Sequence, residues 1–138
     1  MGIALSVLAG MLICLQGVFN TRASEKVGLW ETVALVHGVG LIAALVLVLF
    51  LDAGGLKRLG EVNPLYYTGG ILGAVIVYSV MKGFCLLGPS AALAVVFISQ
   101  IVAATAVETL GWFGTVPVAL SAAKVAGIAL MIIGVLLL

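Results

Sequence analysis

The chain has 138 residues, of which 64% are hydrophobic and 8% are charged, and its mean hydropathy is +1.41. Soluble proteins average roughly 45–50% apolar and about 25% charged residues, so this composition excludes a water-soluble globule. A net charge of +1 gives no basic surface to neutralise phosphates, and this excludes a nucleic-acid-binding protein. The composition predicts a protein whose main solvent is the lipid bilayer.

Five apolar runs are long enough to cross a bilayer as helices. A spanning helix needs about 20 mostly apolar residues, because the hydrocarbon core is roughly 30 Å thick and its backbone polar groups must be paired internally. The runs cover approximately residues 3–19, 30–51, 66–87, 90–110 and 118–138. Turn-forming residues separate them, such as Gly88-Pro89 and Pro117. We expect an all-α polytopic membrane protein with one transmembrane domain over residues 1–138.

Lysine and arginine are divided evenly between the two sides that five spans define. They are Lys57, Arg58 and Lys124 on the side of the N-terminus, and Arg22, Lys26 and Lys82 on the other. Orientation follows an excess of these residues on one side, so the chain is expected to insert both ways. Many secondary transporters consist of two inverted repeats. The pattern predicts an antiparallel homodimer of ten helices; the alternative is a subunit of fixed topology with a paralogous partner.

Several short segments follow one another in an order that resembles a known transporter family. They are LQGVFN (residues 15–20), Val27-Gly28, VHGVG (36–40), SQIVAA (99–104), VETLGWFG (107–114), KVAG (124–127) and Gly134-Val135. Together they resemble the YdcZ-type branch of the drug/metabolite transporter (DMT) superfamily. That family usually has Gly where Ser99 stands, Asp where Glu108 stands, and an aromatic residue near His37. The resemblance implies a five-span half-transporter, paired or fused in tandem, in a bacterial inner membrane.

Polar side chains within the runs are candidates for a solute pathway, because an unpaired polar group in the bilayer centre costs free energy. At a rise of about 1.5 Å per residue, Tyr78 and Gln100 lie close to the midplane, while Gln16 and Asn20 share one face of the first helix. The predicted cavity is lined by Gln16, Asn20, Tyr78, Ser79 and Gln100. Hydrogen bonds that hold the helices together are the equally open alternative.

Four ionisable side chains are candidates for coupling or gating. Glu108 in the fourth run is a candidate for proton exchange, and its alternative role is an interfacial charge or salt bridge. His37 can titrate near neutral pH, although a lone histidine is more often a packing residue. Glu31 opens the second run and Lys82 lies near the end of the third, so we expect these two residues to form an ion pair.

The last run carries small residues at Ala123, Gly127 and Gly134, and small residues let membrane helices approach closely. We predict that this face packs against the partner subunit. The sequence has no nucleotide-binding P-loop, no clustered metal ligands and no recognisable catalytic set, so we expect neither an enzyme nor a cofactor.

The predicted cavity contains amide, hydroxyl and aromatic groups and has no charge at its centre. These groups suit a small neutral hydroxylated solute such as a sugar, which they bind by hydrogen bonding and ring stacking. The leading hypothesis is a secondary-active or facilitative transporter of such a solute. One alternative is a proton-coupled exporter of small organic cations, like the related small multidrug transporters, although Gln16 stands where a carboxylate is needed. A second is a non-transporting membrane assembly subunit.

Overall fold

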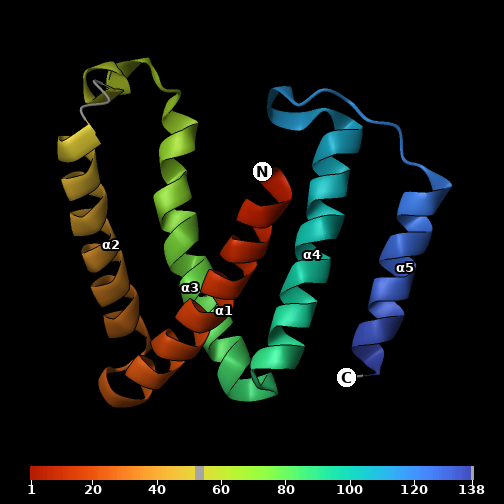
Figure 1. The fold of residues 1–138 in the computed structure, drawn as a ribbon, viewed down its shortest axis with the longest axis horizontal. Helices are drawn as coiled ribbons and strands as arrows, with labels where there is room; N and C mark the ends of the chain where they lie inside the picture. The colour runs from red at the N-terminus through yellow and green to blue at the C-terminus, as the bar shows by residue number, and fades with distance from the viewer. Residues whose placement is uncertain (52–54, 138) are drawn as a thin grey trace. The chain divides into compact units, whose positions relative to one another are not determined.

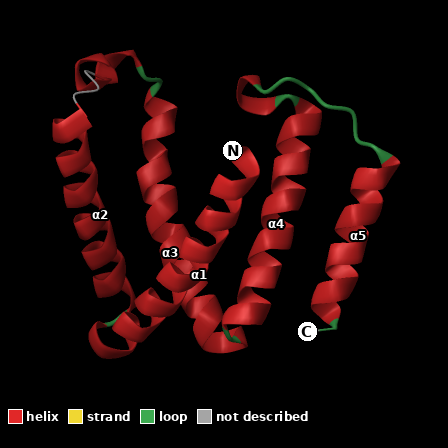
Figure 2. Cartoon of the chain, in the orientation of Figure 1, coloured by secondary structure: helices red, strands yellow, loops and turns green. Residues whose placement is uncertain are grey.

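The computed structural model describes residues 1–51 and 55–137, and Figures 1 and 2 show helices and connecting loops throughout this part. The elements are α1 (Gly2–Val27), α2 (Leu29–Leu51), η1 (Gly55–Glu61), η2 (Pro64–Thr68), α3 (Gly69–Leu87), α4 (Pro89–Leu110), η3 (Trp112–Gly114) and α5 (Ala122–Leu136). Within residues 1–51 and 55–137, four helical segments are long and apolar enough to cross a membrane, and α5 is a shorter apolar helix. An all-α, polytopic membrane protein is thereby confirmed. Leu138 and the side chain of Lys57 lie outside the described part.

The chain divides into two compact units, Met1–Leu86 and Leu87–Leu138. In the first unit, α1 packs against α2, and α2 meets α3 through an aromatic stack and through a histidine that faces a glycine. Trp30 stacks on Tyr78 with ring centroids 4.5 Å apart, and a Cβ at Gly73 would lie 3.3 Å from Nε2 of His37. These contacts set the antiparallel register of α2 and α3.

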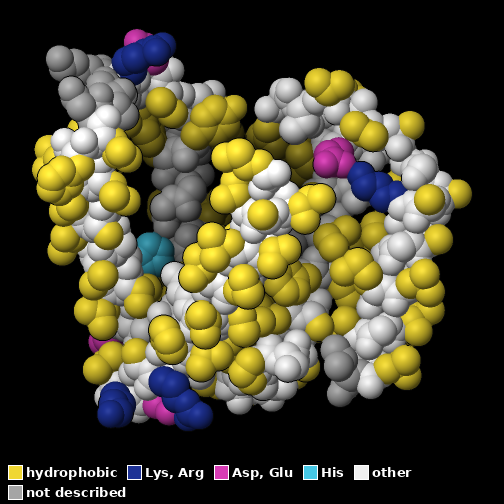
Figure 3. Space-filling view, in the orientation of Figure 1, with side chains coloured by type: hydrophobic (Ala, Val, Ile, Leu, Met, Phe, Trp, Pro, Cys, Tyr) yellow, Lys and Arg dark blue, Asp and Glu magenta, His cyan; other side chains and the backbone are white. Residues whose placement is uncertain are grey.

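The apolar side chains of this unit mostly point outward. Val33, Met81 and Phe84 form its buried core, whereas Leu41, Ile71 and many similar side chains are exposed. Figure 3 shows hydrophobic side chains over the visible face and charged groups at both ends of the unit. Lipid tails are as apolar as leucine, so outward-facing apolar side chains are favourable in a bilayer.

Helix α1 continues beyond the predicted end of the first span at residue 19 and reaches Val27. Its polar last turns are held by local bonds: Thr21 donates to the carbonyl of Gly17 at 2.8 Å, and Arg22 pairs with Glu25 at 3.2 Å. Side chains three or four residues apart stabilise a helix in this way, which explains why the charged segment remains helical. The helix ends at Gly28, whose φ is 102°.

Helix α5 begins at Ala122, so residues 118–121 of the predicted fifth span are not helical. The side chain of Ser121 accepts a hydrogen bond of 3.2 Å from the backbone N–H of Lys124, which is a typical helix N-cap. In the second unit, α5 packs antiparallel to α4 (Figure 1). The connection is anchored by the N–H of Val118, which donates to the carbonyl of Glu108 at 3.0 Å.

Candidate functional site

One face of α1 carries two amide side chains at the edge of a hollow of about 570 Å³. Gln16 and Asn20 are four residues apart and therefore lie on the same helical face. The hollow is lined by Ala9, Leu12, Ile13, Leu15, Gln16, Phe19 and Asn20. Gln16 is exposed and Asn20 is only 6% exposed. The predicted pair of amides thus meets at one hollow, beside apolar side chains that occupy the rest of its wall.

The Asn20 side chain has no protein hydrogen-bond partner within the described part of the chain. Every fully buried side-chain nitrogen or oxygen among the described residues has a partner, so the unpaired Asn20 amide is not fully buried, and Asn20 is one of the residues that line the hollow. A buried amide without a partner is unfavourable, because it loses its bonds to water without replacing them. This amide is therefore available for hydrogen bonds to a bound molecule.

Gly17 sets the orientation of this amide-bearing face. A Cβ at Gly17 would lie 2.7 Å from Cε2 and Cζ of Phe84 on α3, which is closer than a side-chain carbon can approach. Phe84 is 4% exposed, so its ring is held in the core of the unit. The contact holds Gly17 of α1 against α3, and Gln16 and Asn20, one residue before and three residues after it, line the hollow.

Tyr78 and Ser79 on α3 do not line this hollow, in contrast to the prediction. The ring of Tyr78 stacks on Trp30 with an interplanar angle of 18°, near the beginning of α2. The hydroxyl of Ser79 donates to the carbonyl of Val75 at 2.7 Å. The prediction is based only on the depth of these residues in the membrane along α3. In the structure, Tyr78 has Trp30 as its partner and Ser79 has the carbonyl of Val75, and neither partner lies at the hollow.

His37 lies at the contact between α2 and α3. Its Nδ1 is 2.8 Å from the carbonyl oxygen of Val33, and because a carbonyl only accepts, Nδ1 carries the hydrogen. The other nitrogen, Nε2, faces Gly73. The imidazole is thus oriented by its own helix and packs where α3 has no side chain, which agrees with the packing role considered for a lone histidine.

Glu31 and Lys82 form no ion pair among the described residues, so the structure does not bring these two predicted partners together. The register set by Trp30 and Tyr78 brings Glu31 level with the middle of α3, while Lys82 lies a turn further along that helix. The Glu31 carboxylate instead folds back over Gly28, where a Cβ would lie 2.2 Å from Oε2. Lys82 is exposed.

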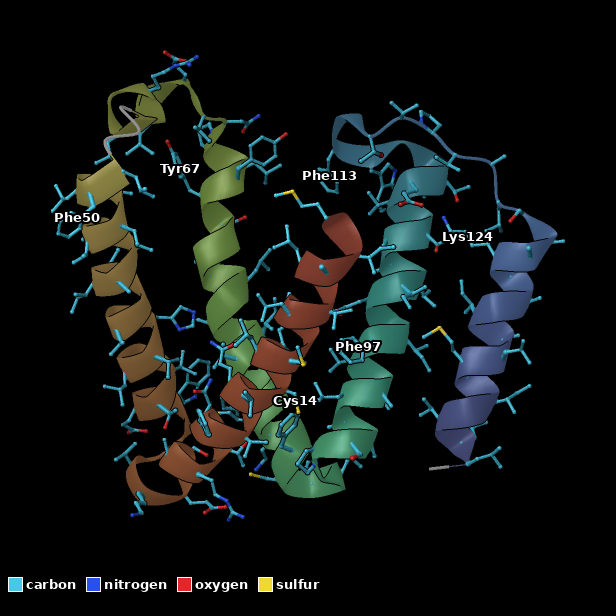
Figure 4. All side chains as sticks on the ribbon, in the orientation of Figure 1. Cys14, Phe50, Tyr67, Phe97, Phe113 and Lys124 are labelled. Atoms are coloured by element: carbon cyan, nitrogen blue, oxygen red, sulfur yellow. The ribbon has the colours of Figure 1, made fainter. Side chains whose placement is uncertain are left out.

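Glu108 pairs with Lys124 in the second unit. The distance from Nζ to Oε2 is 2.6 Å, and the side chains of Lys124 and Glu108 are 36% and 47% exposed. Figure 4 shows Lys124 between α4 and α5, and Figure 3 shows acidic and basic side chains adjacent there. The salt bridge that was considered for Glu108 is therefore present. Its partner was missed, although an antiparallel pair of helices with a short connection brings these two positions level.

In the second unit, the Gln100 side chain and the small residues of α5 are exposed. Gln100 is exposed on α4, and Ala123, Gly127 and Gly134 are exposed on α5. No atom lies within 4 Å of the Cβ positions of Gly127 and Gly134. A separate hollow of about 360 Å³ is lined by Val102, Thr105, Ala106, Thr109, Leu110, Leu120, Val125 and Ile128. It is apolar apart from two threonines and does not include Gln100.

Long apolar helices that turn their side chains outward define the class of this molecule, an integral membrane protein with several spans. Within that class, residues 1–137 match a family described as "Putative inner membrane exporter, YdcZ". The chain belongs to this family and is an inner membrane protein, and the family description is that of an exporter. Neither a curated protein nor a solved structure matched the chain.

Proposed function

We propose that the protein is half of a transporter that exports a small, neutral, hydrogen-bonding solute across the inner membrane. The observation that carries this proposal is the pair of amides at the α1 hollow, with Asn20 buried and without a protein partner. Amide groups both donate and accept, so they suit hydroxyl groups and give no preference for charge. The family description supports the direction of transport.

The state of Glu108 favours a neutral solute over an organic cation. A cation is attracted to a carboxylate without a countercharge, but Lys124 lies 2.6 Å from this one. A cationic substrate would have to compete with the lysine for this carboxylate, although the cost is modest because the ion pair is partly exposed. The polar groups at the α1 hollow are uncharged, since Gln16 and Asn20 are its hydrogen-bonding side chains.

The second half of the transporter is supplied by an antiparallel copy of the chain. The equal numbers of lysine and arginine on the two sides support insertion in both orientations. The open face of α5, with Ala123, Gly127 and Gly134, provides a surface on which a second copy can pack. The proposed transporter is therefore a homodimer of two inverted copies of the chain. Many secondary transporters are likewise built from two inverted halves.

Flux through reconstituted protein tests this proposal. Purified protein in liposomes is expected to carry labelled methyl glucoside but not tetraethylammonium. Gln16→Ala and Asn20→Ala should each lower sugar flux about tenfold, because each loses hydrogen bonds to the solute. Ser6→Ala is the matched control, since the Ser6 hydroxyl donates to the carbonyl of Gly2 at 3.1 Å and lies outside the hollow.

Two results would reverse the proposal. Flux of the cation that disappears in Glu108→Gln, with no sugar flux in any variant, identifies a cation exporter. Absence of flux for every solute under every gradient favours the non-transporting assembly subunit.

A further inference from the structure

The wall of the α1 hollow is divided by chemistry along the helix. Its amides, Gln16 and Asn20, lie toward the C-terminal end beside Leu15 and Phe19, whereas the N-terminal end, with Ala9, Leu12 and Ile13, is wholly apolar. At a rise of about 1.5 Å per residue, the apolar part from Ala9 to Gln16 extends roughly 10 Å. A solute with hydroxyl groups on all sides would leave many of them against hydrocarbon, without hydrogen-bond partners.

We infer that the solute of this site is a neutral amphiphile, with a hydroxylated head bound by Gln16 and Asn20 and an aliphatic tail lying along Leu12 and Ile13. This inference rests on the proposed function and specifies the substrate of the same site. The hydroxyl groups of the head supply hydrogen bonds to the buried Asn20 amide, whereas a lipid acyl chain has no hydrogen-bonding group to offer it. The tail covers apolar wall, and each buried methylene adds to affinity.

Alkyl glucosides provide the probe, because they share one hydroxylated head and differ only in tail length. Full-length protein in lipid nanodiscs is titrated with labelled methyl and hexyl glucoside below micelle-forming concentrations, and binding to empty nanodiscs is subtracted. Hexyl glucoside should bind at least about tenfold more tightly than methyl glucoside, since part of its longer tail is buried.

Two leucines on α1 give a matched pair of variants for the tail. Leu12 lines the hollow and is 54% exposed, whereas Leu5 is 56% exposed and does not line it. Leu12→Ala should lower the affinity for hexyl glucoside severalfold and leave that for methyl glucoside unchanged. Leu5→Ala should change neither. Asn20→Leu, which keeps the side-chain size, should weaken both glucosides; if it does not fold, the leucine pair still decides the question.

The possible outcomes separate this inference from the proposed function. Equal affinity for the two glucosides, both weakened in Asn20→Leu, overturns the amphiphile and leaves a neutral-solute transporter intact. Binding of hexyltrimethylammonium without binding of either glucoside overturns the proposed function as well. If lipid or a second copy fills the hollow, no saturable glucoside binding is seen, and this also overturns the inference.

Discussion

Gly28 separates α1 from α2 in a backbone conformation that glycine alone adopts readily. Its φ of 102° and ψ of 160° are strained for any residue with a Cβ, and the Glu31 carboxylate occupies the space that a Cβ would need. We predict that Gly28→Ala lowers the free energy of unfolding by about 1–3 kcal/mol. Thermal unfolding in detergent, followed by circular dichroism, measures the change.

Gly10→Ala is the control for this substitution. No atom lies within 4 Å of a Cβ at Gly10, which is in the interior of α1, so alanine there should raise stability by about 0.5–1 kcal/mol. Equal effects of the two substitutions would show that the backbone at Gly28 is not strained.

The Glu108–Lys124 ion pair gives a second prediction at this scale. Because both side chains are partly exposed, the coupling free energy is expected to be only about 0.5–1 kcal/mol. A double-mutant cycle with Glu108→Gln and Lys124→Met measures it in the unfolding free energy. The exposed pair of Arg58 and Glu61, at 2.8 Å, is the control and should show less coupling. Strictly additive effects at Glu108 and Lys124 would contradict an energetic role for the pair.

Residue spacing along one helix was sufficient to predict which side chains share the α1 face. Gln16 and Asn20 follow directly from the helical period, and both line the hollow. The role of Tyr78 could not be obtained in this way, because its stacking on Trp30 depends on register between helices. The position of Glu31 over Gly28 is a local contact, but it depends on the backbone turn between α1 and α2, which the helical period does not describe.

At the scale of elements, the contact of α1 with α3 depends on the absence of a side chain at Gly17. We predict that Gly17→Ala destabilises the protein by about 1–3 kcal/mol, because the new methyl group overlaps the buried ring of Phe84. Adding Phe84→Leu should restore part of this loss by making room. Thermal unfolding of the single and double variants checks both statements. If Gly17→Ala behaves like Gly10→Ala, the helices do not approach as closely as the structure indicates.

The hydrophobic pattern predicted the helical elements better than their ends. Helix α1 extends to Val27 because its charged and hydroxyl side chains bond within their own turns. Helix α5 starts at Ala122 because Ser121 caps it, although the apolar run begins earlier. Hydropathy reports solvent preference, whereas local hydrogen bonds decide where a helix begins and ends.

At the scale of the whole molecule, the open face of α5 is the proposed contact with a second copy. A Cβ at Gly127 would meet nothing within 4 Å outside its own turn of helix, so Gly127→Leu should leave each copy folded and weaken dimer crosslinking in membranes. Gly38→Leu is the control, because Gly38 is equally open and lies on α2. Unaltered crosslinking in Gly127→Leu would remove this face from the proposed interface.

Composition alone established the class of protein, since 64% hydrophobic residues require a lipid environment. The ordered motifs indicated the family, and the match over residues 1–137 confirmed it. The proposed assembly depends on how the chain is oriented in the membrane, and the equal distribution of Lys and Arg predicts that no strong bias fixes that orientation.

Reporter fusions at the C-terminus test the antiparallel assembly most directly. A fluorescent protein that matures only inside the cell and a phosphatase active only outside should both give signal, because the proposed assembly needs copies inserted in both orientations. Replacing Arg22 and Lys26 by alanine should shift the balance toward the phosphatase, since the side with Lys57, Arg58 and Lys124 then carries the excess of positive charge. Signal from one reporter alone in the unmodified chain would contradict an assembly of inverted copies.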